Sequence, residues 1–502
     1  MPDWVAWGVV VLTAGTLALL IPFALHRTHL IRLARRERAE RGRWTGPLPK
    51  VTVQLPVYNE AGVVERLVDA AAGMDYPREL LEVQLLDDST DETSERGARR
   101  VAHWRERGVR IRHLRRGTRE GFKAGALAEG MRVADGEFLL ILDADFVPNP
   151  DLIHRLLGPF QDPGVGMVQA RWDYLNEHAS VLTRCQALLL DAHFFMEQGG
   201  RWAADRFMNF NGTAGMWRRR ALDDAGGWSA DTLTEDLDIS YRAQMAGWRF
   251  VFRPGVGVPS ELPEDVRSLE VQQKRWSQGG IQTARKVLPD LLKGDWSPAV
   301  KREAAVHLLG HLAYPLTLLL GILLLPSAFA RRALGLDELL LVDSFVFVGA
   351  TLSFLIFFCA AGRRRRRSWP RLIPTAIGAL ALGIGLTATV SGAVLRGARP
   401  GVRDPFHRTP KRGSGAYRYL SPGAPRDTFV KLALLAWMAG SAVIAIQHGL
   451  FATLPFLVLF GAGYGWLGMG ELFATPTAAP LSRRSGLEKG GAARDYDPIA
   501  SS

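Results

Sequence analysis

Long apolar runs lie toward both ends of the chain and leave a polar stretch over residues 50–300 between them. The first run, Trp4–Leu25, is long enough to cross a hydrocarbon core of about 30 Å. Further candidate spans follow Lys301, at Ala304–Ala330, Leu339–Ala361, Val430–Gln447 and Leu450–Gly470. This distribution predicts a polar domain inserted between transmembrane helices.

The formal net charge of +12 is concentrated beside the apolar runs. Arginines follow the first span at Arg27, Arg32, Arg35, Arg36, Arg38, Arg41 and Arg43, and others follow a later span at Arg363–Arg367. Such residues at membrane ends set orientation and contact anionic lipid, so we expect a lipid bilayer and no nucleic acid as partner. They predict a protein integral to the plasma (inner) membrane, with the N-terminus outside and the polar domain in the cytosol. The two cysteines, Cys185 and Cys359, are too few for a disulfide framework, which fits a reducing compartment.

The segment Leu372–Leu395 is ambiguous. If it crossed the membrane once, the basic loop Arg396–Arg426 would fall outside, against the positive-inside rule. We therefore expect an interfacial or re-entrant segment there. The predicted divisions are an anchor at 1–26, a basic juxtamembrane segment at 27–49, the polar domain at 50–300, the later membrane helices at 301–471 and a disordered tail at 472–502.

The polar domain alternates strand-like and helix-like patterns. Strands are expected at Lys50–Pro56, Glu82–Leu86, Val109–Leu114, Phe138–Leu142 and Val165–Trp172. Helical patterns between them predict a parallel sheet with helices on both faces. Beyond it, Ala179–Met196 is expected to be helical, and Phe210–Arg220 to be a loop leading into a helix.

Asp143 and Asp145 directly follow the apolar run Phe138–Leu142. Open α/β sheets bind ligands at the carboxyl ends of their strands. Carboxylate oxygens suit Mg²⁺ or Mn²⁺, which proteins hold with one or two carboxylates plus substrate phosphates. A strand-end turn with two solvated aspartates is the plain alternative, and the pair gains weight only from the motifs that accompany it.

Those motifs occur in a specific order: LDDSTDET, GFKAGALAEGM, FNGTAGMWRRRAL, TEDLDISYRA, ELPEDVRSLEVQQKRWSQGG and FHRTPK. Together with Asp143-x-Asp145 they resemble the processive membrane-bound family 2 glycosyltransferases, and among them the cellulose-synthase-like mannan and glucan synthases. The resemblance covers residues 50–290 well and the membrane part loosely. It implies an α/β GT-A (Rossmann-like) glycosyltransferase domain on the cytosolic side.

The resemblance also implies roles on the donor side. Asp145 would hold Mg²⁺ or Mn²⁺, with Asp143 supporting the metal and contacting the nucleotide-sugar. Lys123, at a glycine-flanked helix start, would meet the diphosphate. The nucleoside would be bound by Asp88 together with Tyr58 and Glu60.

On the acceptor side, Asp236 is the expected general base, and the neighbouring Glu235 should raise its pKa. Both residues also suit a helix start, and that structural role does not compete with catalysis. Gln272, Arg275 and Trp276 share one helical face, suited to a sugar ring, its hydroxyls or the diphosphate.

The phenylalanine loop FHRTPK implies a gating role for Phe406, Thr409 and Lys411. Arg408 departs from the valine that the family usually has there.

The function that follows is inverting transfer of a hexose from a UDP- or GDP-sugar to a growing β-linked polysaccharide, which would leave through the spans after Lys301. Single transfer to a lipid acceptor, a polyprenyl phosphate or a ceramide-like lipid, remains open because such enzymes keep similar motifs. A non-catalytic transporter or scaffold should have lost at least one motif residue, and each is present in the sequence. The donor, the choice between Mg²⁺ and Mn²⁺, and protein partners remain open.

Overall fold

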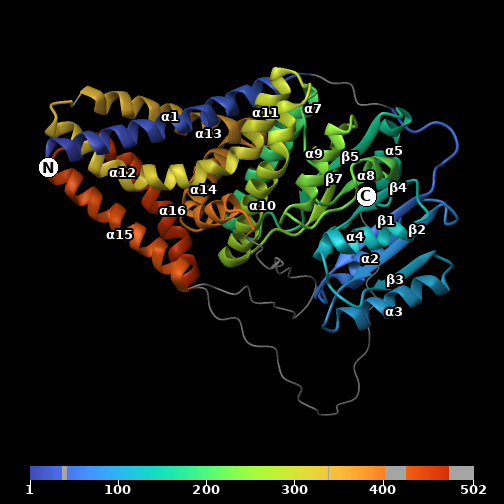
Figure 1. Ribbon diagram of the computed structural model, residues 1–502. Coiled ribbons are helices and arrows are strands. Elements are labelled where there is room, and N and C mark those ends of the chain that lie inside the picture. Colours follow the sequence, from blue (N-terminus) through green and yellow to red (C-terminus); the bar gives the residue numbers. More distant parts are fainter. Residues whose placement is uncertain (37–41, 337, 402–424, 474–502) are drawn as a thin grey trace, which may run out of the picture.

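The computed structural model describes residues 1–36, 42–336, 338–401 and 425–473. It has two parts, an α/β domain and an elongated bundle of long helices (Figure 1). Helix α1 (Asp3–Ala34) precedes the domain in sequence and lies in the bundle. The rest of the bundle follows the domain.

A 7-stranded sheet forms the centre of the domain, in the order β3-β2-β1-β4-β6-β5-β7. Its strands are β1 (Val51–Val57), β2 (Leu81–Asp87), β3 (Ile111–Arg115), β4 (Phe138–Ile141), β5 (Val165–Tyr174), β6 (Gly215–Arg218) and β7 (Arg249–Ser260). Strand β6 is antiparallel to both β4 and β5, and the remaining neighbours pair in parallel. The sheet is therefore mixed.

The prediction that every strand pairs in parallel is wrong at the centre of the sheet, where β6 is antiparallel. The predicted strands β1 to β5 are confirmed to within a few residues. Strand β6 lies inside the segment expected to be a loop, because a strand of 4 residues is too short to show alternation. Strand β7 contains Pro254 and Gly255, which weaken a strand pattern, and its pairing with β5 shifts register near Ala170. Strands β6 and β7 therefore form because of their pairing within the sheet rather than because of their local sequence.

Both faces of β4 are covered. Leu140 packs with α2 (Val64–Ala72) on one face, whereas Leu139 and Ile141 pack with α4 (Phe122–Arg132) on the other. This two-sided burial explains why the strand is apolar at every position. The other covering helices are α3 (Thr93–Glu106), α5 (Leu152–Leu157), α8 (Arg219–Asp224) and α9 (Glu235–Met245).

Several helices lie between the sheet and the bundle. The expected helix over Ala179–Met196 consists of α6 (Val181–Asp191), which continues into a π-helical turn, η2 (Ala192–Gln198), and α7 (Gly199–Ala203). Helix α10 (Val266–Lys293) carries the last motif of the domain and packs against α14 (Trp369–Ala398) of the bundle. Residues of α6, η2 and α10 belong to the same hydrophobic cluster as the bundle helices, so these helices attach the domain to the bundle.

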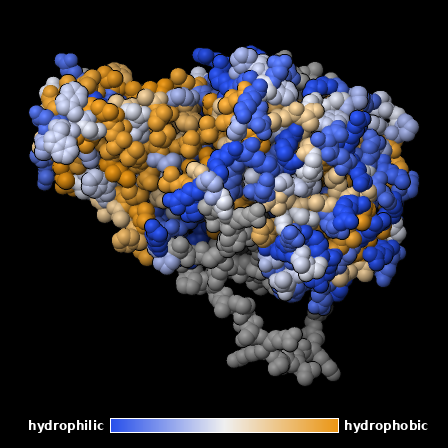
Figure 2. Space-filling model, viewed as in Figure 1, coloured by the Kyte–Doolittle hydropathy of each residue, from blue (hydrophilic) through white to orange (hydrophobic). Residues whose placement is uncertain are grey.

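Six helical segments of the described residues are long and apolar enough to cross a membrane. They are α1, α11–α12 (Pro298–Leu309 and Ala313–Ala333), α13 (Glu338–Arg364), α14 (Trp369–Ala398), α15 (Pro425–Gln447) and α16 with its preceding turn (Leu454–Leu472 and Phe451–Thr453). The bundle surface is apolar over a broad area, whereas the domain surface is hydrophilic (Figure 2). These features indicate a membrane protein.

Helix α14 contains the segment that the sequence left ambiguous. It runs through Trp369–Ala398 without reversing, so the re-entrant form of the expectation is wrong. Its apolar window is 67% buried inside the protein, against 22% for that of α1. Protein rather than lipid surrounds most of α14, and an interfacial position remains a prediction.

Candidate active site

Polar loops at the carboxyl ends of β1, β2 and β4 lie side by side at one edge of the sheet. Tyr58 and Glu60 follow β1, Asp88 follows β2, and Asp143 and Asp145 follow β4. Parallel pairing of β1 with both β2 and β4 brings these loops together. The side chains that the sequence suggested for the donor and the metal therefore share one edge.

Two arginines of the basic loop before α4 cover the residues suggested for the nucleoside. Arg116 pairs with Asp88, with 2.9 Å between Nε and Oδ1, and donates to the carbonyl of Phe122 over 3.0 Å. The guanidinium of Arg119 lies 3.4 Å from the centroid of the Tyr58 ring. Sequence reasoning assigned the two arginines no role, because only the fold brings them to Asp88 and Tyr58.

Lys123 lies in the middle of the charged groups. Its Nζ donates to Asp143 Oδ1 over 2.5 Å and to the carbonyl of Gly212 over 2.9 Å, and lies 3.9 Å from Glu235 Oε1. Burial by itself lowers the pKa of Lys123, but the carboxylates of Asp143 and Glu235 outweigh burial and the net pKa is raised. The lysine therefore carries its charge at neutral pH.

Asp143 and Asp145 present oxygen donors of the kind that divalent cations prefer. Asp145 is only 4% exposed, and its Oδ2 accepts from the backbone N–H of Glu261 over 3.3 Å. In the part of the chain that the structure describes, no group of three or more His, Cys, Asp or Glu side chains forms a complete ligand set. Mg²⁺ and Mn²⁺ sites with one or two carboxylates take their other ligands from phosphates and water, and Asp143 and Asp145 fit such a site.

Asp236 approaches Lys123 from α9. Its Oδ1 accepts from the backbone N–H of Leu237 over 2.8 Å. Its Oδ2 faces Gly212, where an added Cβ would lie 2.9 Å from Oδ2 and 3.5 Å from Lys123 Nζ. Gly212 also has a φ of 79°, so both space and backbone conformation require glycine here.

The pKa of Asp236 is raised above its usual range. Burial is the main cause and the Glu235 carboxylate adds to it, whereas the positive charges of Lys123 and Arg275 oppose it. A carboxylate with a raised pKa is a better proton acceptor near neutral pH. The sequence suggested the contribution of Glu235 but not the larger contribution of burial.

Helix α10 holds the start of α9 in place. The backbone N–H of Leu233 donates to Gln282 Oε1 over 3.0 Å, and the hydroxyls of Thr234 and Thr283 lie 3.2 Å apart. A Cβ on Gly279 would come within 2.6 Å of Thr234, so this glycine allows the close approach. The helix with Gln272, Arg275 and Trp276 thus also positions the loop that leads to Asp236.

Two tryptophans meet beside the site. The ring centroids of Trp276, on α10, and Trp172, on β5, lie 6.4 Å apart. The Trp172 centroid also lies 5.4 Å from that of Phe146, which directly follows Asp145. Trp217, on β6, is fully buried, with its ring centroid 5.2 Å from that of Phe250. Trp217 is therefore a core residue.

The structure brings together the residues suggested for the donor and Asp236, with Arg275 of α10 near enough for its charge to act on Asp236. The gating-loop residues Phe406, Thr409 and Lys411 lie outside the described residues.

Comparison with known proteins identifies the class. Residues 49–279 match the family model described as "Glycosyltransferase like family 2". Glucomannan 4-beta-mannosyltransferase 2 of Arabidopsis thaliana is 41% identical over 251 residues, 49% of this chain and 47% of that protein. Glucomannan 4-beta-mannosyltransferase 1 of Oryza sativa subsp. japonica is 40% identical over 255 residues, 50% of this chain and 49% of that protein. The chain spans about half the length of these relatives.

Among solved structures, a mannosyltransferase from Pyrobaculum calidifontis, in complex with GDP-Man and Mn²⁺, is 22% identical with a TM-score of 0.49. The match covers 74% of this chain and 100% of that one.

Residues 49–279 are a family 2 glycosyltransferase domain with a GT-A-like fold. This class follows from the family match, the mixed sheet and the polar loops at the carboxyl ends of its strands. Its curated relatives are the glucomannan 4-beta-mannosyltransferases, of the cellulose-synthase-like family.

Proposed function

We propose that this chain is an inverting, metal-dependent membrane glycosyltransferase that adds hexose units from a nucleotide-sugar to a β-linked polysaccharide. The observation that carries the proposal is the meeting of Asp236, Lys123 and Asp143 at the carboxyl edge of the sheet. The names of the relatives make a mannose donor the first to test, and GDP-mannose is chosen as its nucleotide-sugar. UDP-linked hexoses follow.

On the donor side, Lys123 donates to Asp143 and to the Gly212 carbonyl, and an ammonium group carries three donors, so one donor remains for a diphosphate oxygen. It would bind the diphosphate and stabilise the charge that develops as this group leaves. A divalent ion held by Asp143 and Asp145 would neutralise further charge on the leaving group. The nucleoside would be held by Asp88, Tyr58 and Glu60. Arg116 and Arg119, which contact Asp88 and Tyr58, would lie over it.

On the acceptor side, Asp236 would take the proton of the attacking hydroxyl. Attack from the face opposite the diphosphate inverts the anomeric centre. Trp276 offers a flat surface for the acceptor sugar. On the same face of α10, Gln272 and Arg275 would donate hydrogen bonds to the hydroxyls of that sugar or to the diphosphate.

The membrane part supports a topology. Arg364 donates to the carbonyl of Ala34 over 2.8 Å, so the basic ends of α1 and α13 lie together beside the domain. Together with the positive-inside rule, this arrangement favours a cytosolic domain and an N-terminus outside. The membrane would be the plasma (inner) membrane. The polymer would leave through the helices after Lys301, with the loop of Phe406, Thr409 and Lys411 gating the site.

The test is release of nucleoside diphosphate by detergent-purified full-length protein, first with GDP-mannose and then with other GDP- and UDP-sugars, each with Mg²⁺ or Mn²⁺. Asp236→Asn should abolish release while donor binding survives. Asp223→Asn is the matched control, because Asp223 is an exposed carboxylate at the end of α8.

Sizing the product separates the two acceptor classes. A ladder or high polymer supports polysaccharide synthesis, whereas one sugar on a lipid replaces it with the lipid-acceptor reaction. If the protein neither turns over nor binds any of these donors, the proposed function is wrong.

A further inference from the structure

The arginine run at the end of α13 is not uniform. From the sequence, Arg363–Arg367 reads as a single block of membrane-end charge. In the structure Arg363, Arg364 and Arg366 are exposed, whereas Arg365 and Arg367 are half-buried against the glycosyltransferase domain. The sequence expectation of a topological anchor therefore accounts for only part of the run.

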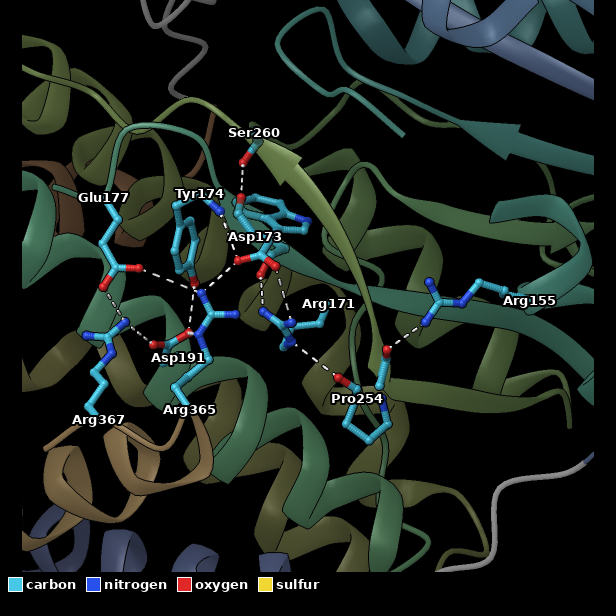
Figure 3. Close-up of polar contacts among 12 residues, drawn as sticks. Arg155, Arg171, Asp173, Tyr174, Glu177, Asp191, Pro254, Ser260, Arg365 and Arg367 are labelled. Atoms are coloured by element: carbon cyan, nitrogen blue, oxygen red, sulfur yellow. Dashed lines mark hydrogen bonds and ion pairs between the residues drawn. The ribbon is translucent and has the colours of Figure 1, made fainter. Parts of the chain in front are cut away.

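Arg365 and Arg367 each contact two or more carboxylates of the domain. Arg365 lies 2.7 Å from Asp173 Oδ1 and 3.6 Å from Asp191 Oδ1. Arg367 lies 2.6 Å from Asp191 Oδ2 and 2.9 Å from Glu177 Oε1. Figure 3 shows Arg365 between Asp173 and Asp191, with Arg367 reaching Glu177 and Asp191 from the same loop.

The charges in this cluster balance. Arg171 lies 3.5 Å from Asp173 and completes a set of three arginines and three carboxylates. Asp191 is fully buried, which raises its pKa to about 6 against the opposing charges of Arg367 and Arg365. A buried carboxylate without its partners raises the free energy of the folded state. Removing the two arginines of the loop should therefore loosen the contact between the loop after α13 and the end of β5.

The cluster adjoins the proposed acceptor side of the site through two consecutive residues of β5. Asp173 directly follows Trp172 in β5, and Trp172 contacts both Trp276 and Phe146, with centroids 6.4 and 5.4 Å away. Phe146 directly follows Asp145. The end of β5 thus lies between the loop after α13 and two motif elements of the site.

We propose that Arg365 and Arg367 are positioning residues: they hold the end of β5, and with it Trp172, against Trp276 on α10. The consequence for catalysis rests on the proposed function. Both act through Trp172 and serve acceptor transfer. The donor-side residue Asp88 directly follows β2, which β1, β4 and β6 separate from β5 in the strand order.

The experiment compares the full-length Arg365→Ala/Arg367→Ala variant with Arg366→Ala, which removes an exposed charge from the same run. Hydrogen–deuterium exchange is measured over residues 165–174 and 266–280. Donor binding and the transfer rate are measured in parallel. The double variant should exchange faster in both segments and transfer roughly tenfold to hundredfold more slowly, while donor affinity is unchanged. Arg366→Ala should match the wild type in every readout.

A single Arg365→Lys variant, which keeps the charge, replaces the double variant if the latter fails to fold, and should give the same pattern more weakly. Unchanged exchange in both segments, or a parallel loss of donor binding and transfer, would overturn the positioning role. If the wild type neither turns over nor binds any donor, the proposed function fails, and the exchange data still decide whether Arg365 and Arg367 hold β5 and α10.

Discussion

Lys123 Nζ lies 2.5 Å from Asp143 Oδ1, so the lysine of one motif is paired with the first aspartate of another. The two residues come from the start of α4 and the loop after β4. Because the pair exists in the protein itself, the lysine head is already held at the edge where a donor would bind. This preorganisation reduces the ordering cost of binding.

Replacing Lys123 with glutamine should weaken binding of a nucleoside diphosphate, because a charge-assisted contact is lost. The expected loss is about 2 kcal/mol, or roughly thirtyfold in Kd. Titration calorimetry with GDP or UDP and Mn²⁺ measures it. Lys293→Gln, at the exposed end of α10, is the control and should bind as the wild type does. Equal affinities for both variants would contradict a diphosphate role for Lys123.

Glu235 should influence the pH dependence through Asp236. A base must be deprotonated, so turnover falls as the pH drops through the raised pKa of Asp236. Glu235→Gln removes a negative charge that raises this pKa, and the acid limb of the kcat profile should move down by about one pH unit. An acid limb that stays in place or moves up would refute this coupling. Asp223→Asn should leave the profile unchanged.

Removal of divalent cations should stop turnover if Asp143 and Asp145 hold a metal. Chelation with EDTA should abolish release of nucleoside diphosphate, and Mn²⁺ or Mg²⁺ should restore it. Asp145→Asn should need at least about tenfold more metal, because one carboxylate ligand is lost. Mn²⁺ binding followed by electron paramagnetic resonance provides a readout without turnover. Full activity in EDTA would exclude metal dependence.

Gly279→Ala should separate α9 from α10. The new Cβ would lie 2.6 Å from a side-chain atom of Thr234 and 2.8 Å from its backbone nitrogen, so backbone must shift. The expected cost is about 1–3 kcal/mol, with lower activity, since the start of α9 carries Asp236. Thermal unfolding in detergent measures the stability. Gly383→Ala in α14 is the control, because an added Cβ there meets nothing within 4 Å.

Much of the domain could be predicted from local pattern. The strand Phe138–Ile141 was evident because burial on both faces leaves an unbroken apolar run. The antiparallel strand β6 could not be predicted, since Met216 and Trp217 acquire strand character only through pairing with β4 and β5. Helix α14 was ambiguous because a single crossing would put the basic loop Arg396–Arg426 outside. Only the structure shows that its apolar window is 67% buried inside the protein, because composition does not distinguish protein from lipid as surroundings.

The candidate site follows the same division. Asp143 and Asp145 stood out because carboxylates at a strand end have a local signature. The resemblance to family 2 glycosyltransferases added Asp88 and Asp236. Arg116 did not stand out, because its contact with Asp88 joins two loops that are distant in sequence.

The sequence by itself therefore determined which residues are candidates for the chemistry and which segments are apolar enough for a membrane, because both depend on residue type and spacing. Only the tertiary structure decided the rest. It gave Lys123 its partner Asp143, raised the pKa of Asp236 through burial, and separated Arg365 and Arg367 from the exposed Arg366. These properties depend on distance and exposure, which arise only when remote segments pack together.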